Sequence, residues 1–282
     1  MKFSSTQFDK QISVNTSLFS INLSEIWQYR ELIWIFVKRD IVSANKQTLL
    51  GPLWFFLAPL FTVFIYTFVF NNIAGISTDG VPAILFYLAG TSLWNYFQTC
   101  FMATSSTFLT NASLFGKVYF PRMVSPISIV ISSLLKFFIQ LGLFLVVWGY
   151  FWYKGDVFPN WTLVFLPFYI LLLAIISLGA GIIISSLTTK YRDLTYFISF
   201  GVTLWMYITP VIYPLSAIPQ QFKSFIEYNP IAPIIEAFRY GFTGHGILNS
   251  FDLFYSFGVG IILLLVGILL FNRTEKTFMD TV

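Results

Sequence analysis

The chain has 282 residues, of which 57% are hydrophobic and only 10% are charged, with a formal net charge of +4. A water-soluble globular protein needs more polar side chains to cover its surface, so this composition predicts an integral membrane protein. The basic residues are spread along short loops instead of forming a patch, which argues against nucleic-acid binding.

The first 50 residues precede the apolar part of the chain and divide into two segments. Residues 1–24 are rich in Ser, Thr and Asn and lack an apolar core, so we expect a polar cytoplasmic tail, not a signal peptide. Residues 25–50 predict an amphipathic interface helix, capped by Ser24, that carries the basic residues Arg30 and Arg39. Its apolar positions at helical spacing are Ile26, Tyr29, Ile33 and Val37. Such a helix is either an anchor in the headgroup layer or a lever against a cytoplasmic partner.

Six apolar stretches are each long enough to cross the hydrocarbon of a bilayer, which takes about 20 residues of helix. They cover residues 53–72, 82–108, 125–152, 162–187, 194–213 and 253–271. A soluble helix of this length would show a polar face, and these stretches show none. We therefore expect an all-α integral membrane fold with six transmembrane helices. One transmembrane domain would cover residues 51–275, followed by a short cytoplasmic tail over 276–282.

The distribution of Lys and Arg predicts the orientation of the chain. With six spans, 12 basic residues lie on the side that carries both termini and 3 lie on the opposite side. The positive-inside rule then places both termini in the cytoplasm of a multi-pass protein.

The connection between the second and third spans predicts one short cytoplasmic helix. Asn111 is its expected N-cap and Gly116 its expected stop, with Leu114 and Phe115 exposed at the tip. Exposed apolar residues normally need a partner surface, so the tip either docks on a cytoplasmic protein or lies among the headgroups.

The connection between the fifth and sixth spans, from Pro214 to about Ser250, predicts two short helices on the external side. They cover roughly Pro219–Tyr228 and Pro230–Tyr240, where Asn229 can cap the second helix and Glu236 is spaced to pair with Arg239. Both are too short to span a bilayer and too apolar for a solvated loop. We expect a re-entrant pair that narrows the external mouth of a pathway; the alternative is a hairpin lying on the outer leaflet.

Stripes of aromatic and polar residues run along three of the spans. They are Phe55, Thr62, Tyr66 and Phe70, then Tyr87, Thr91, Trp94 and Gln98, and finally Tyr196, Phe200, Thr203 and Tyr207. Hydroxyl and amide groups are costly against lipid, so we expect these faces to point inward. Flat rings with scattered hydrogen-bonding groups suit a sugar polymer that must slide. For any single residue the alternative is ordinary packing between helices.

Chemistry-bearing residues are few. Lys136 is the only charged residue inside a predicted span, and it either contacts an anionic headgroup or snorkels towards the cytoplasm. No span carries paired carboxylates, which argues against an ion relay. The chain lacks the Gly-rich loop that cradles ATP phosphates, and with one His245 and one Cys100 we expect no metal site.

Several of these segments together resemble the permeases of polysaccharide-exporting type-2 ABC transporters. The run Lys117-Val118-Tyr119-Phe120-Pro121-Arg122 looks like the end of their cytoplasmic coupling loop. Tyr191-Arg192-Asp193-Leu194, Thr209-Pro210-Val211-Ile212-Tyr213 and Asn229-Pro230 followed by Glu236 and Arg239 match the same family in order and placement. The resemblance covers roughly Glu25 to the C-terminus, and the family includes exporters of O-antigen, capsular polysaccharide and teichoic acid.

The resemblance implies a permease that is not itself an enzyme, in the bacterial inner membrane. Two copies would form the pathway for a lipid-linked glycan, and two separate ATPase subunits would hold ATP and Mg, with no cofactor bound by this chain. It implies ATPase contacts through the interface helix and the Asn111–Gly116 helix, and an external gate in the re-entrant pair.

Three other functions remain as alternatives. A type-2 ABC exporter could carry a drug or plain lipid, and a passive channel or secondary transporter would need no ATPase. A membrane glycosyltransferase would need an acidic cluster for a metal-bound sugar nucleotide.

Overall fold

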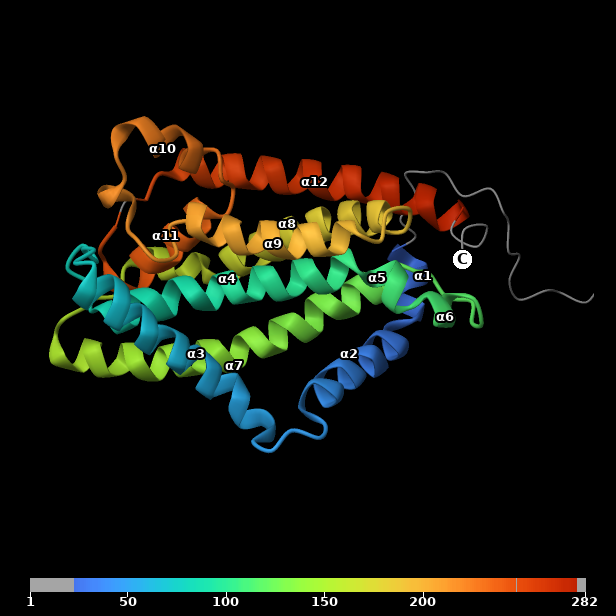
Figure 1. The fold of residues 1–282 in the computed structure, drawn as a ribbon, viewed down its shortest axis with the longest axis horizontal. Helices are drawn as coiled ribbons and strands as arrows, with labels where there is room; N and C mark the ends of the chain where they lie inside the picture. Colours follow the sequence, from blue (N-terminus) through green and yellow to red (C-terminus); the bar gives the residue numbers. More distant parts are fainter. Residues whose placement is uncertain (1–22, 247, 278–282) are drawn as a thin grey trace, which may run out of the picture.

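The computed structural model describes residues 23–246 and 248–277, and every regular element in this part of the chain is helical. The tails expected over 1–24 and 276–282 lie largely outside the described residues. Five long helices run side by side and form the body of the molecule (Figure 1). They are α4 (Ala83–Ser105), α7 (Val124–Lys154), α8 (Leu166–Thr188), α9 (Leu194–Ile208) and α12 (Ser250–Thr277).

Shorter elements gather at the two ends of this body (Figure 1). One end, the α6 end, carries α1 (Leu23–Gln28), α5 (Thr107–Thr110), α6 (Ala112–Phe115) and the last turns of α12. The other, the α11 end, carries α10 (Gln220–Glu227) and α11 (Ala232–Thr243). Helix α2 (Arg30–Asn45) packs along α7, and α3 (Trp54–Tyr66) crosses α4 and α7 obliquely.

Four helical segments are long and apolar enough to cross a membrane: Gly51–Ile73, Val124–Lys154, Trp161–Thr188 and Ser250–Glu275. They correspond to the first, third, fourth and sixth expected spans. The second expected span is a helix of 23 residues, α4, but 16 of them are buried inside the chain and its polar residues lower its hydropathy. The fifth, α9, is apolar but has only 15 residues.

The fifth span is shorter than the sequence suggested. We expected it to reach Tyr213, but α9 ends at Ile208 and Thr209 adopts an extended conformation with φ −86° and ψ 140°. Proline disfavours the helical conformation of the residue before it, so Pro210 ends the helix. The second span is also shorter, because Ser106 interrupts the helix between α4 and α5.

The interface helix is broken at Tyr29 into α1 and α2. Ser24, the expected cap, lies inside α1 instead. The expected apolar face is confirmed, because Ile26 and Val37 are buried and Ile33 is half-buried. Trp27 of α1 and Trp34 of α2 are exposed. The position of this segment in the headgroup layer stays a prediction.

Helix α8 lies between α4 and α12 and packs closely against α12. A Cβ atom on Gly179 would lie 2.6 Å from the backbone nitrogen of Leu264. A Cβ on Gly267 would lie 2.8 Å from the carbonyl oxygen of Gly179. Backbone atoms cannot yield as a flexible side chain can, so the absence of side chains at both positions sets the distance between α8 and α12.

Replacing Gly179 by Ala therefore should lower the stability of the fold. Overpacking of this kind costs roughly 1–3 kcal/mol, and thermal unfolding of the purified protein in detergent measures it. Gly142→Ala is the matched control, because Gly142 is also helical but a Cβ there meets nothing within 4 Å. Equal melting temperatures for the two variants would contradict the close packing.

Candidate functional site

The loop at the α6 end differs from the exposed tip that the sequence predicted. Phe115 is buried, with its ring 6.0 Å from that of Phe108 and 5.6 Å from that of Phe120. Leu114 is half-buried against the same cluster. The rings of Phe36 in α2 and Phe271 in α12 complete the cluster, so Phe115 fastens the loop to the bundle.

Asn111 occupies the expected N-cap position of α6, but its side chain makes no capping hydrogen bond. It is buried, and its amide donates hydrogen bonds to the carbonyl oxygen of Thr107 at 3.1 Å and to the hydroxyl of Ser125 at 3.0 Å. Its side-chain oxygen accepts a hydrogen bond of 3.5 Å from Arg39. The structure thus joins Arg39 of the expected interface helix to Asn111 of the expected cytoplasmic helix. Arg30, by contrast, is exposed near Trp27. No pattern in the sequence pairs residues 72 positions apart.

The exposed part of this loop is the stretch from Gly116 to Tyr119. Val118 and Tyr119 are 53% and 65% exposed, so they, and not Phe115, are the apolar side chains open to a partner. Arg122 lies behind them and donates a hydrogen bond of 2.6 Å to the carbonyl oxygen of Glu275 near the end of α12. Together these residues line a pocket of about 280 Å³.

The α11 end is organised around Arg239, whose side chain is buried. One guanidinium nitrogen donates to the carbonyl oxygen of Pro210 at 2.6 Å and to the Glu236 carboxylate at 3.0 Å. The other donates to the carbonyl oxygen of Val211 at 2.6 Å. The pairing of Glu236 with Arg239 that the sequence predicted is confirmed. Arg239 also stabilises the fold, because its guanidinium binds carbonyl groups that the end of α9 leaves without partners.

Helix α4 contributes two residues to this site that the sequence analysis missed. The guanidinium lies 3.7 Å from the centre of the Phe86 ring, within the range of a cation–π contact. Gly90 makes room for it, because a Cβ there would lie 2.5 Å from the Arg239 nitrogen and 2.8 Å from the Val211 carbonyl oxygen. A glycine inside an expected helix was the available signal.

Asn229 joins the same site from the connection between α10 and α11. Its amide donates a hydrogen bond of 2.8 Å to the hydroxyl of Thr209, and its side-chain oxygen accepts one of 3.1 Å from the backbone of Ile231. The N-cap residue of α11 is Ile231, so the expectation that Asn229 caps this helix was wrong. Asn229 instead holds the segment before α11 against the break after α9.

Two short helices occupy the connection after α9, as expected, but they differ in burial. In α11, ten residues are buried, including Phe238 and Phe242 against Phe144 of α7. Helix α10 lies at the surface and exposes Phe222 and Phe225. Of the expected gate prolines, Pro214 is buried, Pro219 is exposed and Pro230 is intermediate.

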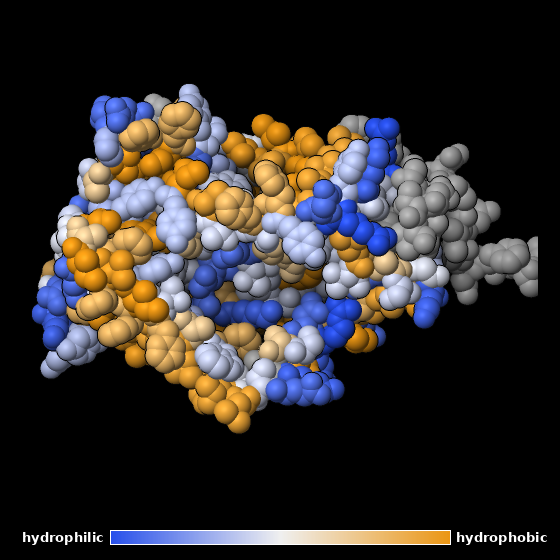
Figure 2. Space-filling view, in the orientation of Figure 1, coloured by the Kyte–Doolittle hydropathy of each residue, from blue (hydrophilic) through white to orange (hydrophobic). Residues whose placement is uncertain are grey.

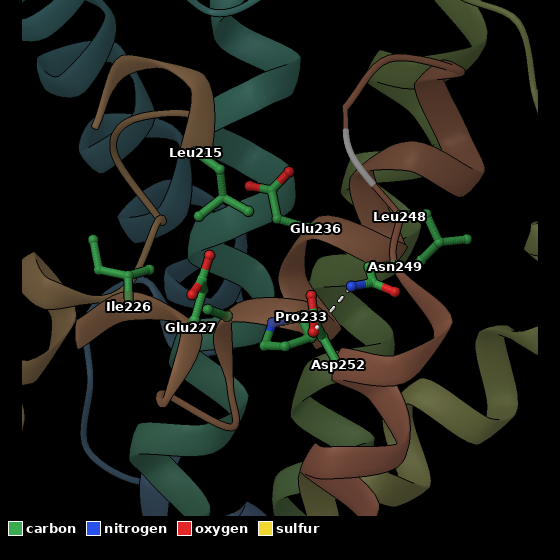
Figure 3. A pocket seen from close by; sticks show the side chains of 9 residues that line it. Leu215, Ile226, Glu227, Pro233, Glu236, Leu248, Asn249 and Asp252 are labelled. Atoms are coloured by element: carbon green, nitrogen blue, oxygen red, sulfur yellow. Dashed lines mark hydrogen bonds between the residues drawn. The ribbon is translucent and has the colours of Figure 1, made fainter. Parts of the chain in front are cut away.

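A small pocket of about 50 Å³ lies between these helices and the start of α12 (Figure 3). Glu227, Glu236 and Asp252 line it, and Asn249 donates a hydrogen bond of 3.2 Å to Asp252. Burial raises the pKa of Glu236, and the positive charge of Arg239 opposes that rise. Burial lowers the pKa of Arg239, and Glu236 opposes that fall. The two groups therefore depend on each other to stay charged.

The three aromatic stripes have different surroundings. Tyr87 and Trp94 are fully buried and pack inside the chain, with Trp94 against Trp205 of α9, so they support a wall and do not line an open space. Tyr66 and Phe70 are half-buried. Phe55 and Gln98 are also half-buried, whereas the α9 stripe faces outward, with Tyr196 82%, Phe200 62% and Tyr207 52% exposed.

Polar groups collect on the face of the molecule that carries α3 and α9. Figure 2 shows hydrophilic side chains in the middle of this face, over α4 and α7 and beside the apolar side chains of α3. A pocket of about 230 Å³ lies between α2, α4 and α7, and Lys136 lines it together with Arg39 and Asn111. The side chain of Lys136 therefore faces a pocket with a largely polar lining.

Comparisons with known proteins agree with the resemblance seen in the sequence. The family model of the ABC-2 type transporter matches residues 31–243. The O-antigen export system permease protein RfbA of Klebsiella pneumoniae is 30% identical over 251 residues, which cover 89% of this chain and 94% of that protein. RfbA of Myxococcus xanthus is 27% identical, with 92% and 98% covered. The polysialic acid transport protein KpsM of Escherichia coli is 23% identical, with 86% and 93% covered.

The buried ion pair leads to a prediction about stability. Arg239→Met leaves Glu236 buried without its partner, which costs about 3–5 kcal/mol. The purified variant should melt well below the wild type in detergent. Arg192→Met is the control, because Arg192 is exposed.

The double variant Glu236→Gln, Arg239→Met separates the cost of the uncompensated charge from the cost of lost packing. It should melt above Arg239→Met, because no buried charge remains without a partner. A double variant that is no more stable than Arg239→Met would contradict a charge-based cost.

Proposed function

The chain belongs to the ABC-2 type transporter family, and we propose on that basis that it is the permease subunit of an exporter that moves a polysaccharide across the bacterial inner membrane. The observation that carries this proposal is the similarity, over nearly the whole chain, to O-antigen export system permeases and to a polysialic acid transport protein. No activity of an enzyme is needed for this role, because the permease supplies a path and the partner supplies the energy.

One copy of the chain does not enclose a path for a glycan, because the face that carries α3 and α9 is uncovered. The α9 stripe presents Tyr196, Phe200 and Tyr207 outward. The apolar segment Gly51–Ile73, which contains α3, has only 11% of its most apolar stretch buried within the chain. Hydroxyl groups facing lipid are costly, whereas they are useful against sugar. We therefore propose that a second copy of the chain covers this face, and that a lipid-linked glycan passes between the two copies.

The orientation follows from the basic residues. The α6 end carries Arg39, Lys117, Arg122 and Arg273, so we place it in the cytoplasm, with both termini. The α11 end then faces outward, where α11 and the buried Arg239 close the path from one side. In this arrangement Pro214, Asn229, Pro230 and Glu236 position the external gate, and exposed Pro219 begins its outer helix.

The cytoplasmic partner in this proposal is a separate ATPase, present in two copies, which holds the ATP and Mg. Lys117, Val118 and Tyr119 form its contact surface, because they are the exposed residues of the α6 loop. Phe115 and Asn111 carry motion from that surface into α5, α7 and α12 through their buried contacts. Leu114 supports the loop from a half-buried position.

The export role is tested by deleting the gene and following the glycan. The deletion strain should lose the surface polysaccharide and accumulate its lipid-linked form inside the cell, and the intact gene should restore both. Immunoblots of whole and lysed cells measure the two pools. Normal surface polysaccharide in the deletion strain would refute the proposal, and accumulation of another lipid or drug would redirect it to that substrate.

The contact surface is tested by charge. The double variant Val118→Asp, Tyr119→Asp should fold normally but reduce export about tenfold or more, because charges displace two apolar contacts of an interface. Co-purification of the ATPase with the membrane-extracted permease measures the contact directly. Phe158→Asp is the control, because Phe158 is a comparably exposed aromatic (63%) at the opposite end and lies outside the proposed gate.

Phe115→Asp should behave differently from the surface variant. It places a charge inside the aromatic cluster, so it should lower the amount of folded permease before it affects coupling.

The outcome of the Val118→Asp, Tyr119→Asp variant decides the assignment of the contact surface. If that variant keeps full export and ATPase binding, the α6 loop is not the contact with the ATPase.

A further inference from the structure

The pocket between α2, α4 and α7 has the chemistry of a site for a phosphorylated headgroup. Two cationic side chains line it, Arg39 from α2 and Lys136 from α7. Hydroxyl groups from all three helices surround them, and Asp40 is the one carboxylate among the described lining residues. Guanidinium, ammonium and hydroxyl donors around a small cavity are the groups that bind phosphate oxygens.

The donors are available for a ligand. Lys136 makes no hydrogen bond or ion pair with any residue from 23 to 277 that the structure describes. Among the lining hydroxyls in that range, those of Thr99, Thr110 and Ser133 also have no internal partner. Arg39 contacts Asp40 through Nε at 2.9 Å and Nη2 at 2.8 Å, and Asn111 through Nη1 at 3.5 Å. Each outer nitrogen keeps a second N–H for a ligand, on a side chain that is 45% exposed.

The depth of the pocket fits a headgroup. Helix α2 contributes Arg39, Asp40 and Ser43 to the lining, and it is the amphipathic helix whose opposite face exposes Trp34. Such helices lie at the boundary between headgroups and acyl chains, where the phosphates are. Lys136 lines the same pocket from α7, so it lies at the level of these α2 residues.

We propose that this pocket binds the phosphoryl group of a lipid at the cytoplasmic surface, with Arg39 and Lys136 as its two cationic ligands. The place of this pocket in transport rests on the proposed function, because a lipid-linked glycan carries its phosphate at the junction of lipid and sugar. Its lining residues come partly from α4 and α7, the helices that carry the hydrophilic face, so a bound headgroup would present its glycan to that face.

The site also contacts the coupling loop. Arg39 donates a hydrogen bond to Asn111, which in turn holds Thr107 and Ser125. A phosphate that attracts Arg39 competes with Asn111 for the same donor. Occupancy of the pocket is therefore positioned to change the contacts of α5 and α7 beneath the ATPase surface.

The binding test uses the full-length permease, with its ATPase, in maltoside detergent that contains no phosphate. Isothermal titration calorimetry with farnesyl diphosphate measures affinity, and farnesol is the ligand control without phosphate. Lys136→Gln and Arg39→Gln should each weaken binding of the diphosphate about tenfold or more, the usual effect of losing one charge-assisted contact. Lys136→Arg should retain binding. Asp40→Asn should bind more tightly, because it removes the one negative charge of the lining.

The matched controls change the same residue types outside the pocket. Lys38→Gln neutralises an exposed neighbour of Arg39 on α2, and Lys154→Gln neutralises the exposed end of α7. Both should bind farnesyl diphosphate as the wild type does. Melting temperatures of all variants show whether a loss of binding reflects a loss of folding.

The source of the phosphate is resolved by a second titration with dioctanoyl phosphatidylglycerol. Tighter binding of farnesyl diphosphate assigns the pocket to the glycan carrier, and equal binding assigns it to membrane phospholipid. Farnesol binding as tightly as its diphosphate, or wild-type affinity in both Gln variants, would overturn the proposal. Because binding is measured without ATP or export, this result is independent of the deletion experiment that tests the proposed function.

Discussion

The fold of the α11 end depends on one buried cation. An arginine inside an apolar bundle is stable only if its charge and its donors find partners, and Arg239 finds them in Glu236 and in the carbonyl groups of Pro210 and Val211. Its Nε atom is the exception, with no partner among the described residues. Since these partners belong to α11 and to the segment after α9, one side chain fixes the two elements together.

This constraint explains why α9 can stop short of the full thickness of a bilayer. Pro210 ends the helix, and the carbonyl groups that the break leaves open are satisfied by Arg239, while Asn229 binds the Thr209 hydroxyl. Irregular backbone at membrane depth is tolerated where protein surrounds it. Phe86 and Gly90 of α4 form the remaining wall, so three helices depend on the same guanidinium.

The sequence predicted the elements well and their surroundings poorly, for a physical reason. Apolar length, proline positions and the spacing of Glu236 and Arg239 are local properties, and the all-helical fold and the ion pair were confirmed. Of the six expected spans, four are long and apolar enough to cross a membrane in the described part of the chain. Burial is not local. A phenylalanine is equally stable against lipid, a partner or its own chain, so the sequence could not show that Phe115 packs on Phe108 or that Tyr87 and Trp94 are interior. The same limit hid the contact between Arg39 and Asn111.

The two ends of the molecule solve the problem of buried charge in opposite ways. At the α11 end the cation is enclosed, and its partners are permanent parts of the fold. At the α6 end Lys136 lines an open pocket and has no hydrogen-bond or ion-pair partner among the described residues, and Arg39 divides its donors between Asp40 and Asn111. Charges that lack full internal compensation have free energy to gain from an external anion. In the orientation proposed above, the rigid end would form the outer gate, and the end with uncompensated charge would face the proposed ligand and the ATPase.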